Sequence, residues 1–326
     1  MKHTIFLILS LLIIACKKEV QKEKTEITPV IESEIVKEQN TSIKKEEKET
    51  DEQYSHKNTI LENVMVPFTP RFFKEASDHQ NLLGFYVGYF QAKEFSNTAK
   101  NPSYSNKINI SINHITKDSI FGHSVVAGNA RPFKGLIRFK TKIFVEATEP
   151  GDDKYDGQFD FTIYPDEEKI IGRWYANNKD LAVTVREYTL NKRKFIYNAE
   201  SNLSFDIDYD YNLALYDSQD DENGELEAIS SKVIGKLNAS IQELTNTDVE
   251  NLNKGELEVL RNLIYARHGY SFKNRKMRYF FDSNIDWYIP VSTDIRGTLT
   301  DLEKKNIDLI KRYEQHAERY YDYFGR

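Results

Sequence analysis

The segment GQFDFTIY, residues 157–164, decides the fold, because its polar and apolar residues alternate strictly. Successive side chains of a β-strand point to opposite faces of a sheet. Phe159, Phe161 and Ile163 therefore share one face, and the residues between them share the other. One apolar face and one wet face are typical of an antiparallel sheet that covers a core on one side only.

Similar alternating runs fill the chain from Leu83 to Tyr188. They are Leu83–Ala92, Lys107–Ile115, Asp118–Ala127, Phe133–Lys140, Lys142–Thr148, Gly157–Tyr164, Glu168–Tyr175 and Asp180–Tyr188. Eight consecutive short strands predict an antiparallel meander that closes into a β-barrel, lipocalin-like or flattened. The alternative is a flattened barrel or a sandwich that encloses no cavity.

The loop lengths predict which end of this barrel carries a pocket. In an up-and-down meander the odd-numbered loops share one end, and here they are the longer ones: 93–106, 128–132, 148–156 and 176–179. We therefore expect a pocket at the odd-loop end, with Arg131, Asp152, Asp153 and Asp156 at its rim. Aspartate oxygens suit Ca²⁺, but this spacing is not that of an EF-hand, so we predict no metal.

Residues 1–15 predict a secretory signal peptide. The apolar run Ile5–Ile14 is too short to span a bilayer, which takes about 20 residues. The sequence Ile13-Ile14-Ala15-Cys16 resembles the bacterial lipobox. The resemblance implies a diacylated thiol, cleavage before Cys16 and acylation of the new amine, for example with palmitate, and several acyl chains anchor a protein stably. An ordinary signal peptide with an incidental cysteine is the alternative.

The lipobox predicts a lipid-anchored protein of the cell envelope. Lys17, rather than Asp, follows the cysteine, which favours the outer membrane, and the Lys/Glu-rich start resembles surface-export signals. Residues 16–66 predict the lipidated Cys and a disordered charged tether, because this composition cannot bury enough apolar surface to fold.

The rest of the chain divides into three parts by its pattern. Residues 67–198 predict the barrel, residues 199–245 a β connector with one further strand over Ile229–Leu237, and residues 246–326 a small helical domain. Capping boxes at Thr247–Glu250, Asn253–Glu256 and Thr300–Glu303 mark helix starts. The predicted fold class is therefore α+β.

The segment RNLIYARHGYSF, residues 261–272, resembles the signature of the YARHG domain. Tyr279-Phe280, Asp286–Pro290 and Leu302–Ile307 resemble its aromatic pair, its tryptophan turn and its closing helix. The family is known as an extracellular module of bacterial proteins, often lipoproteins, without an established activity. The resemblance implies a compartment and a fold unit but no chemistry.

Arg261, Tyr265 and His268 share a helix face, with Arg267 beside them. One interpretation is a site for an anion, such as a phosphate or a carboxylate of a cell-wall peptide. The favoured interpretation is structural: Arg267 pairs with Asp282 or stacks on a tryptophan, and His268 satisfies carbonyls at the helix end.

Composition narrows the function classes. The 45 Lys+Arg against 51 Asp+Glu give a net charge of −6, so nucleic acid is not an expected partner. A single Cys excludes an internal disulfide framework, and no motif indicates catalytic residues or a cofactor. We expect a non-catalytic binding or scaffolding protein, with the membrane and a cell-wall or envelope protein as partners. The alternatives are an envelope enzyme acting on cell-wall or glycan material, and a small-molecule carrier that uses the barrel.

Overall fold

The computed structural model describes residues 78–97, 99–100, 102–203, 210–214 and 226–320. The predicted signal peptide 1–15, the lipidation site Cys16 and the tether 16–66 lie outside the described residues. No helix in the described ranges combines the length and the apolar character that crossing a membrane requires.

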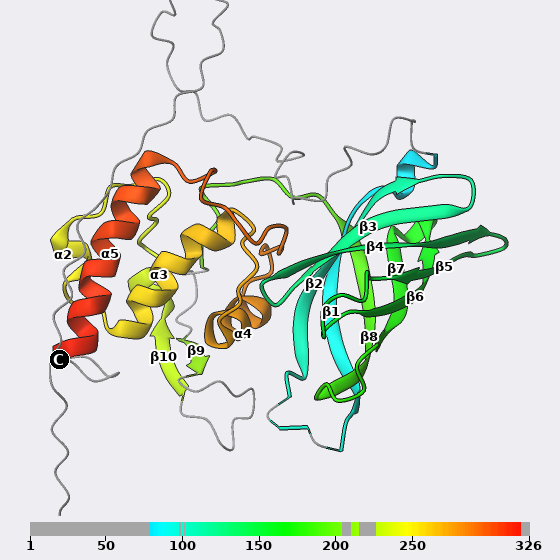
Figure 1. Ribbon diagram of the computed structural model, residues 1–326. Helices are drawn as coiled ribbons and strands as arrows, with labels where there is room; N and C mark the ends of the chain where they lie inside the picture. The colour runs from blue at the N-terminus through cyan, green and yellow to red at the C-terminus, as the bar shows by residue number, and fades with distance from the viewer. Residues whose placement is uncertain (1–77, 98, 101, 204–209, 215–225, 321–326) are drawn as a thin grey trace, which may run out of the picture. The chain divides into compact units, whose positions relative to one another are not determined.

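Eight antiparallel strands form a closed barrel in sequence order (Figure 1). They are β1 Gly84–Phe95, β2 Ser105–Ile115, β3 Ser119–Val126, β4 Asn129–Phe139, β5 Ile143–Thr148, β6 Gly157–Tyr164, β7 Lys169–Ala176 and β8 Val183–Arg193. Pairing of β1 with β8 closes the ring. The predicted α+β class and the meander barrel are confirmed, and the open sandwich is excluded.

The barrel interior is filled by the side chains that the alternation assigned to it. Phe159, Phe161 and Ile163 all face the core, together with Ile108 and Ile110. Most of the interior is therefore a packed hydrophobic core, and packing at this density leaves few voids.

The two ends of the barrel differ. The 3-10 helix η1, Gln80–Leu82, covers the end with the even-numbered loops: Leu82 joins the barrel core, and Tyr86 Oη donates a hydrogen bond to its carbonyl over 3.0 Å. The odd-numbered loops lie at the opposite end. One of them is shorter than predicted, because β3 and β4 meet in a two-residue turn, Ala127-Gly128, rather than in a loop over 128–132. Both turn residues have positive φ (52° and 73°), as a type I′ hairpin requires.

The C-terminal region is mainly helical. It contains β9 Asp210–Ala214, β10 Leu226–Ser230, α1 Ser231–Ile234, α2 Asn246–Val249, α3 Lys254–Arg267, α4 Arg275–Asn284 and α5 Asp301–Tyr320. The strand expected over Ile229–Leu237 is wrong after Ser230, where α1 begins. The first capping box was also misplaced: it joins Thr245 and Asp248, because two Thr-x-x-acid patterns overlap there. The boxes at Asn253 and Thr300 are confirmed.

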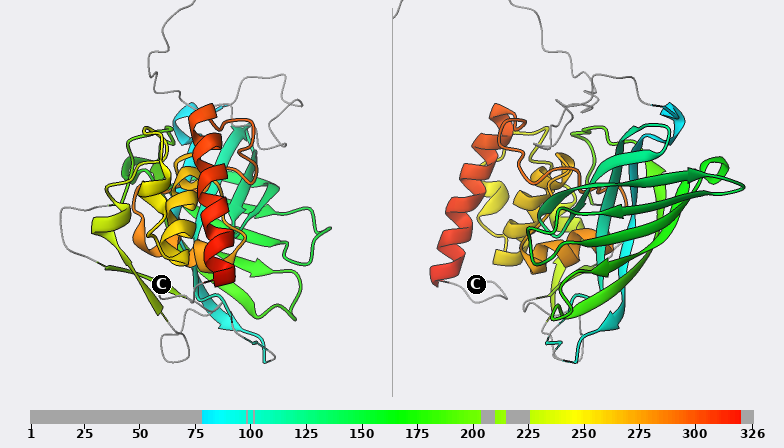
Figure 2. Two further views of the ribbon diagram at one scale, coloured as in Figure 1. Left: turned by 90° about the vertical axis from the view of Figure 1, so that its left-hand side faces the viewer. Right: turned by 45° about the vertical axis from the view of Figure 1, so that its right-hand side comes forward.

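Helix α3 packs in the centre of this region (Figure 2). One face, with Val259 and Leu263, joins a cluster that includes Phe280 and Phe281 of α4. The other face, with Leu260 among its members, packs on α5. Two apolar faces explain why this helix, which carries the YARHG-like segment, is almost entirely buried.

The helical region contacts the outside of the barrel through α4 and the segments beside it. The backbone N–H of Lys107 donates to Asp282 Oδ2 over 2.7 Å, and Lys107 Nζ donates to the carbonyl of Ile285 over 2.8 Å. At the β3–β4 turn, Gly128 N donates to Ser271 Oγ over 3.0 Å. A Cβ at Gly128 would lie 2.5 Å from a side-chain atom of Lys273, so the turn approaches the helical region as closely as glycine allows.

Candidate functional site

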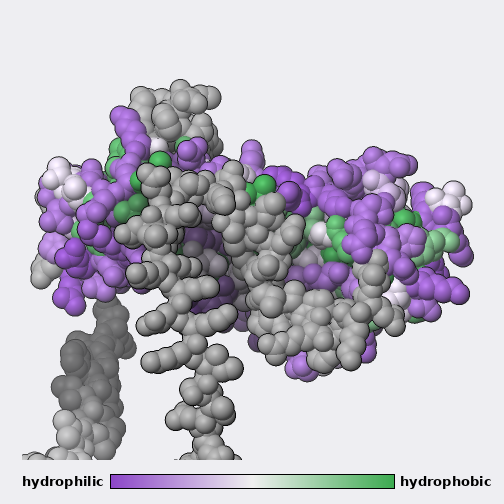
Figure 3. Space-filling model, turned by 90° about the horizontal axis from the view of Figure 1, so that it is seen from above, coloured by the Kyte–Doolittle hydropathy of each residue, from purple (hydrophilic) through white to green (hydrophobic). Residues whose placement is uncertain are grey.

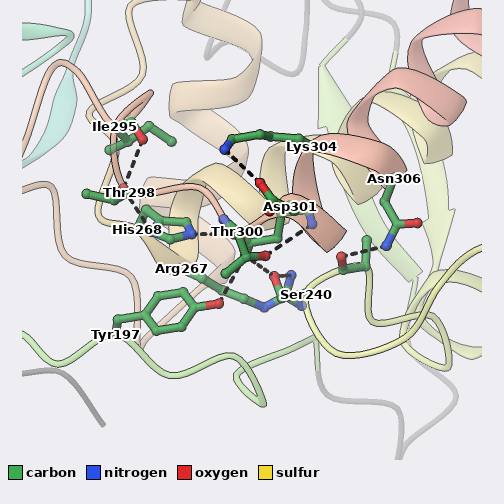
Figure 4. A network of polar contacts seen from close by, with 12 residues as sticks. Tyr197, Ser240, Arg267, His268, Ile295, Thr298, Thr300, Asp301, Lys304 and Asn306 are labelled. Carbon is green, nitrogen blue, oxygen red and sulfur yellow. Dashed lines mark hydrogen bonds and ion pairs between the residues drawn. The ribbon is translucent and has the colours of Figure 1, made fainter. Parts of the chain in front are cut away.

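Glu303 is the centre of a buried polar network in the helical region. Figure 4 shows Tyr197, Ser240 and His268 of this network. Its Oε1 accepts hydrogen bonds from Tyr197 Oη (3.0 Å) and Ser240 Oγ (2.7 Å). Its Oε2 accepts from Thr300 N (2.9 Å) and lies 2.8 Å from His268 Nε2. The capping carboxylate of α5 therefore also connects α3 to two other segments of the chain.

The hydrogen bonds outweigh burial in setting the charge of this carboxyl. Burial by itself raises the pKa of Glu303, but His268, Ser240 and Thr300 stabilise the carboxylate, so its pKa lies below the ordinary value. Burial and the Glu303 charge together raise the pKa of Tyr197. The network therefore holds a carboxylate beside a neutral phenol.

Arg267 is fully enclosed in the same network. Its guanidinium donates to the carbonyl of Ser201 (2.5 Å), to Asn202 Oδ1 (3.1 Å) and to Ser240 Oγ (3.2 Å). Desolvation lowers its pKa to about 10, which leaves it cationic at neutral pH. The predicted pairing of Arg267 with Asp282 is wrong, because the carboxyl of Asp282 lies at the contact with the barrel, where it accepts from Lys107 N. His268 likewise finds Glu303 and Thr298 rather than helix-end carbonyls.

Arg261 and Tyr265 do not join this network. Arg261 Nε donates to Glu314 Oε1 of α5 over 2.7 Å, and its guanidinium lies 5.7 Å from the centre of the Tyr265 ring. Both residues line a cavity of about 470 Å³ on the helical region, together with Arg296. The four residues that the sequence grouped as one binding face thus separate into a buried pair and a cavity-lining pair.

Arg131, Asp152, Asp153 and Asp156 do gather at the odd-loop end. Arg131 Nε lies 3.2 Å from Asp156 Oδ1, and its Nη2 lies 3.4 Å from Asp153 Oδ1. Asp156 Oδ2 also accepts the backbone N–H groups of Gly151 and Asp153, which orders the β5–β6 loop. Asp152 lines a smaller cavity of about 330 Å³ beside them. No group of three or more His, Cys, Asp or Glu suited to a metal occurs in the described part of the chain.

The mouth of the barrel, at this same end, opens into a cavity of about 630 Å³. We call it the mouth cavity. Its apolar wall includes Phe90, Ile108, Phe159 and Trp174 from the barrel strands. Three basic side chains of the helical region line it as well: Lys273, Arg275 and Arg278. The cavity is therefore built jointly by two regions that are far apart in the sequence.

Glu149 is a buried acid in the wall of the mouth cavity. Its Oε1 accepts a hydrogen bond from Ser124 Oγ (3.1 Å), and its Oε2 accepts from Gly157 N (2.8 Å) and Trp174 Nε1 (3.2 Å). Desolvation dominates over these bonds and raises its pKa to about 7. A carboxyl in this state exchanges a proton near neutral pH, while its three donors hold it rigidly in the barrel wall.

Sequence reasoning did not select Glu149, Arg186 or Arg278 as site residues. Arg186 was missed because the alternation of β8 changes phase at a bulge at Thr184, opposite Glu94 and Phe95. Downstream of the bulge, Arg186 shares the inward face with Tyr188 and Leu190, both members of the barrel core. An arginine on an apolar strand face was the signal that could have found it.

The structure thus defines an α+β protein in which a closed eight-stranded barrel precedes a small helical domain. Residues 231–315 match the family model of the YARHG domain. The match begins inside the stretch that the sequence assigned to a connector, so α1 and the segment containing Ser240 belong to the matched region. The chain has no match among curated proteins, and none among solved structures.

Proposed function

We propose that the protein is a lipid-anchored, non-catalytic binding protein of the cell envelope, and that its mouth cavity holds a small-molecule ligand. The observation that carries this proposal is the mouth cavity itself, about 630 Å³ and lined by both the barrel and the YARHG domain. Ligand sites are typically concave, mostly apolar and of about 300–1,000 Å³, with a few placed polar groups. The packed opposite end of the barrel leaves the mouth as the entry.

A binding role is favoured over hydrolysis by the state of the cavity acids. Glu149 accepts hydrogen bonds at both oxygens, and Asp153 pairs with Arg131 and accepts the N–H of Tyr155. A glycan hydrolase needs two carboxyl groups that face the scissile bond. In this proposal Arg267 and His268 hold the YARHG domain together, and the mouth cavity, lined by both regions, binds the ligand.

The ligand site is tested with the neutral fluorescent dye phenylnaphthylamine, whose emission rises in apolar surroundings. Ala182 lines the mouth cavity and is only half-buried, so Ala182→Trp fills the cavity at little cost to folding. The matched control is Ile171→Trp, on the exposed outer face of β7. We expect saturable dye binding that Ala182→Trp abolishes and Ile171→Trp leaves unchanged. Equal binding by all three proteins would reject the mouth as the site.

The anchor is proposed from the lipobox. Acylated Cys16 attaches the chain to the outer membrane, with surface exposure favoured by the charged residues after it. Metabolic labelling with a fatty-acid analogue should mark the wild-type protein but not Cys16→Ser. Label that persists in Cys16→Ser, or a wild type that takes none, would overturn the anchor. Protease treatment of intact cells then distinguishes surface from periplasmic exposure.

A further inference from the structure

The mouth cavity is strongly cationic although the whole chain is acidic. Five of its lining side chains are basic (Arg131, Arg186, Lys273, Arg275 and Arg278), and two are acidic (Glu149 and Asp153). Asp153 pairs with Arg131, and the raised pKa of Glu149 leaves that carboxyl partly protonated at neutral pH. The charges of Arg186 and Arg278 lie in a concave site with apolar walls, where electrostatic interactions are stronger than in water.

Arg186 is buried in the cavity wall without a carboxylate partner among the described residues. Its Nη1 donates to the carbonyl of Phe90 and its Nη2 to the carbonyl of Ser103, both over 2.9 Å. These bonds orient the guanidinium but do not neutralise it. Its carbon Cζ lies 5.1 Å from the centre of the Phe90 ring. Desolvation, followed by the charge of Arg278, lowers its pKa to about 10.

Arg278 reaches the same cavity from α4 and is equally buried, with 8% of its surface exposed. Its Nη1 donates to the carbonyl of Lys273 over 3.2 Å, whereas its buried Nε has no hydrogen-bond partner in the described part of the chain. The charged group with which it interacts on its own helix is Asp282, whose carboxyl is already bound by Lys107 N and whose pKa burial raises to about 7. An unsatisfied buried donor costs stability unless something binds it.

We propose that Arg186 and Arg278 bind the oxyanion group of an amphipathic ligand, a carboxylate or a phosphate attached to an apolar body. Guanidinium groups match the planar geometry of both oxyanions and bind them in pairs of charge-assisted hydrogen bonds. The apolar body then packs on Phe90, Phe159 and Trp174. This inference rests on the mouth cavity being a ligand site, as proposed above, and specifies the chemistry of the ligand.

The test uses two dyes that differ by one anionic group, on the full-length protein. Anilinonaphthalenesulfonate carries a sulfonate, and phenylnaphthylamine is its uncharged counterpart. The variant Arg278→Met removes one charge at nearly constant length, and Arg138→Met, from an exposed ion pair on the outside of β4, is the control for net charge. We expect the anionic dye to bind wild type at least about tenfold more tightly, since each charge-assisted hydrogen bond is worth roughly that factor. Arg278→Met should remove this preference, and Arg138→Met should keep it.

A second measurement needs no variant. Decanoate, decyl phosphate and decanol compete with the anionic dye on the wild-type protein, and the two anions should displace it at concentrations at least about tenfold lower than the alcohol. Whichever anion competes better identifies the oxyanion class. If both dyes bind equally, decanol competes as well as the anions and Ala182→Trp still abolishes binding, the mouth cavity is a ligand site but the oxyanion inference is wrong. If neither dye binds, both the inference and the proposed function fail.

Discussion

The polar network around Glu303 and the mouth cavity both bury arginine side chains, but they treat the charge in opposite ways. In the network, three acceptors satisfy Arg267, and Glu303 supplies a nearby negative charge. In the mouth cavity, the acceptors that the described residues offer to Arg186 and Arg278 are backbone carbonyls, and one buried N–H of Arg278 lacks a partner there. A satisfied network stabilises a domain, whereas an incompletely satisfied cluster of like charges indicates that a binding partner completes it.

The outer surface of the molecule also differs from the mouth cavity. The face of the molecule seen in Figure 3 is mostly hydrophilic, with hydrophobic residues in small separate groups. Exposed apolar side chains such as Leu136 and Phe144 occur on the outside of the barrel, as on most soluble proteins. The combination of apolar wall and uncompensated charge occurs inside the mouth cavity.

The largest expected effect is on the network. Glu303→Ala removes the acceptor of Tyr197, Ser240 and Thr300 and leaves buried donors without a partner. We expect the free energy of unfolding to fall by about 3–5 kcal/mol, measured by denaturant titration. Glu243→Ala, which breaks the exposed ion pair with Lys305, is the control and should cost about 0–1 kcal/mol. Similar losses in the two variants would contradict a stabilising role for the network.

An intermediate effect is expected from pH at Glu149. Its pKa is raised to about 7 in the folded state from 4.5, so the folded protein binds the proton more tightly than the unfolded chain. The carboxyl therefore destabilises the fold increasingly as the pH rises from about 4.5 to 7, and this penalty disappears at lower pH.

Glu149→Gln isolates this contribution, because the amide can still accept from Gly157 and Trp174 while facing Ser124 with its nitrogen. Relative to the variant, wild type should gain about 2 kcal/mol of unfolding free energy between pH 8 and pH 5. Calorimetry of both proteins at the two pH values measures the difference. Parallel pH profiles would mean that Glu149 keeps an ordinary pKa.

The smallest effect is expected at the mouth. In the absence of ligand, Arg278→Met removes a buried charge that repels Arg186, so the free energy of unfolding should change by less than about 1 kcal/mol. The matched substitution Arg267→Met in the network should cost at least about 2 kcal/mol more, because it leaves three acceptors unpaired. Thermal unfolding of the two variants compares them, and equal losses would remove the distinction between the two sites.

Strand alternation was enough to predict the barrel, because strands such as β5 and β6 have one wet face and one buried face. The alternation could not show that the β3–β4 loop is a two-residue turn, since Ala127 is not a residue that usually adopts positive φ. It predicted Phe159 and Ile163 as core residues. Arg186 was missed because a bulge changes the phase of β8, although downstream of the bulge it shares a face with Tyr188 and Leu190.

The candidate site was predictable only in part. Loop lengths placed Arg131 and the three aspartates at the correct end of the barrel. Arg278 joins the mouth cavity only because a helix more than 140 residues downstream of Arg131 in the chain packs there. No local pattern encodes a contact of that kind.

Helix α4 carries both the residue that bonds the barrel, Asp282, and, one turn earlier, a residue of the cavity wall, Arg278. Under the proposed function, occupancy of the cavity and attachment of the two regions are therefore thermodynamically linked. A molecule held by both regions strengthens their association by the same free energy that their association adds to its own affinity. Cutting the chain between β8 and α1 would therefore weaken the binding of such a molecule, even with all eight strands of the barrel intact.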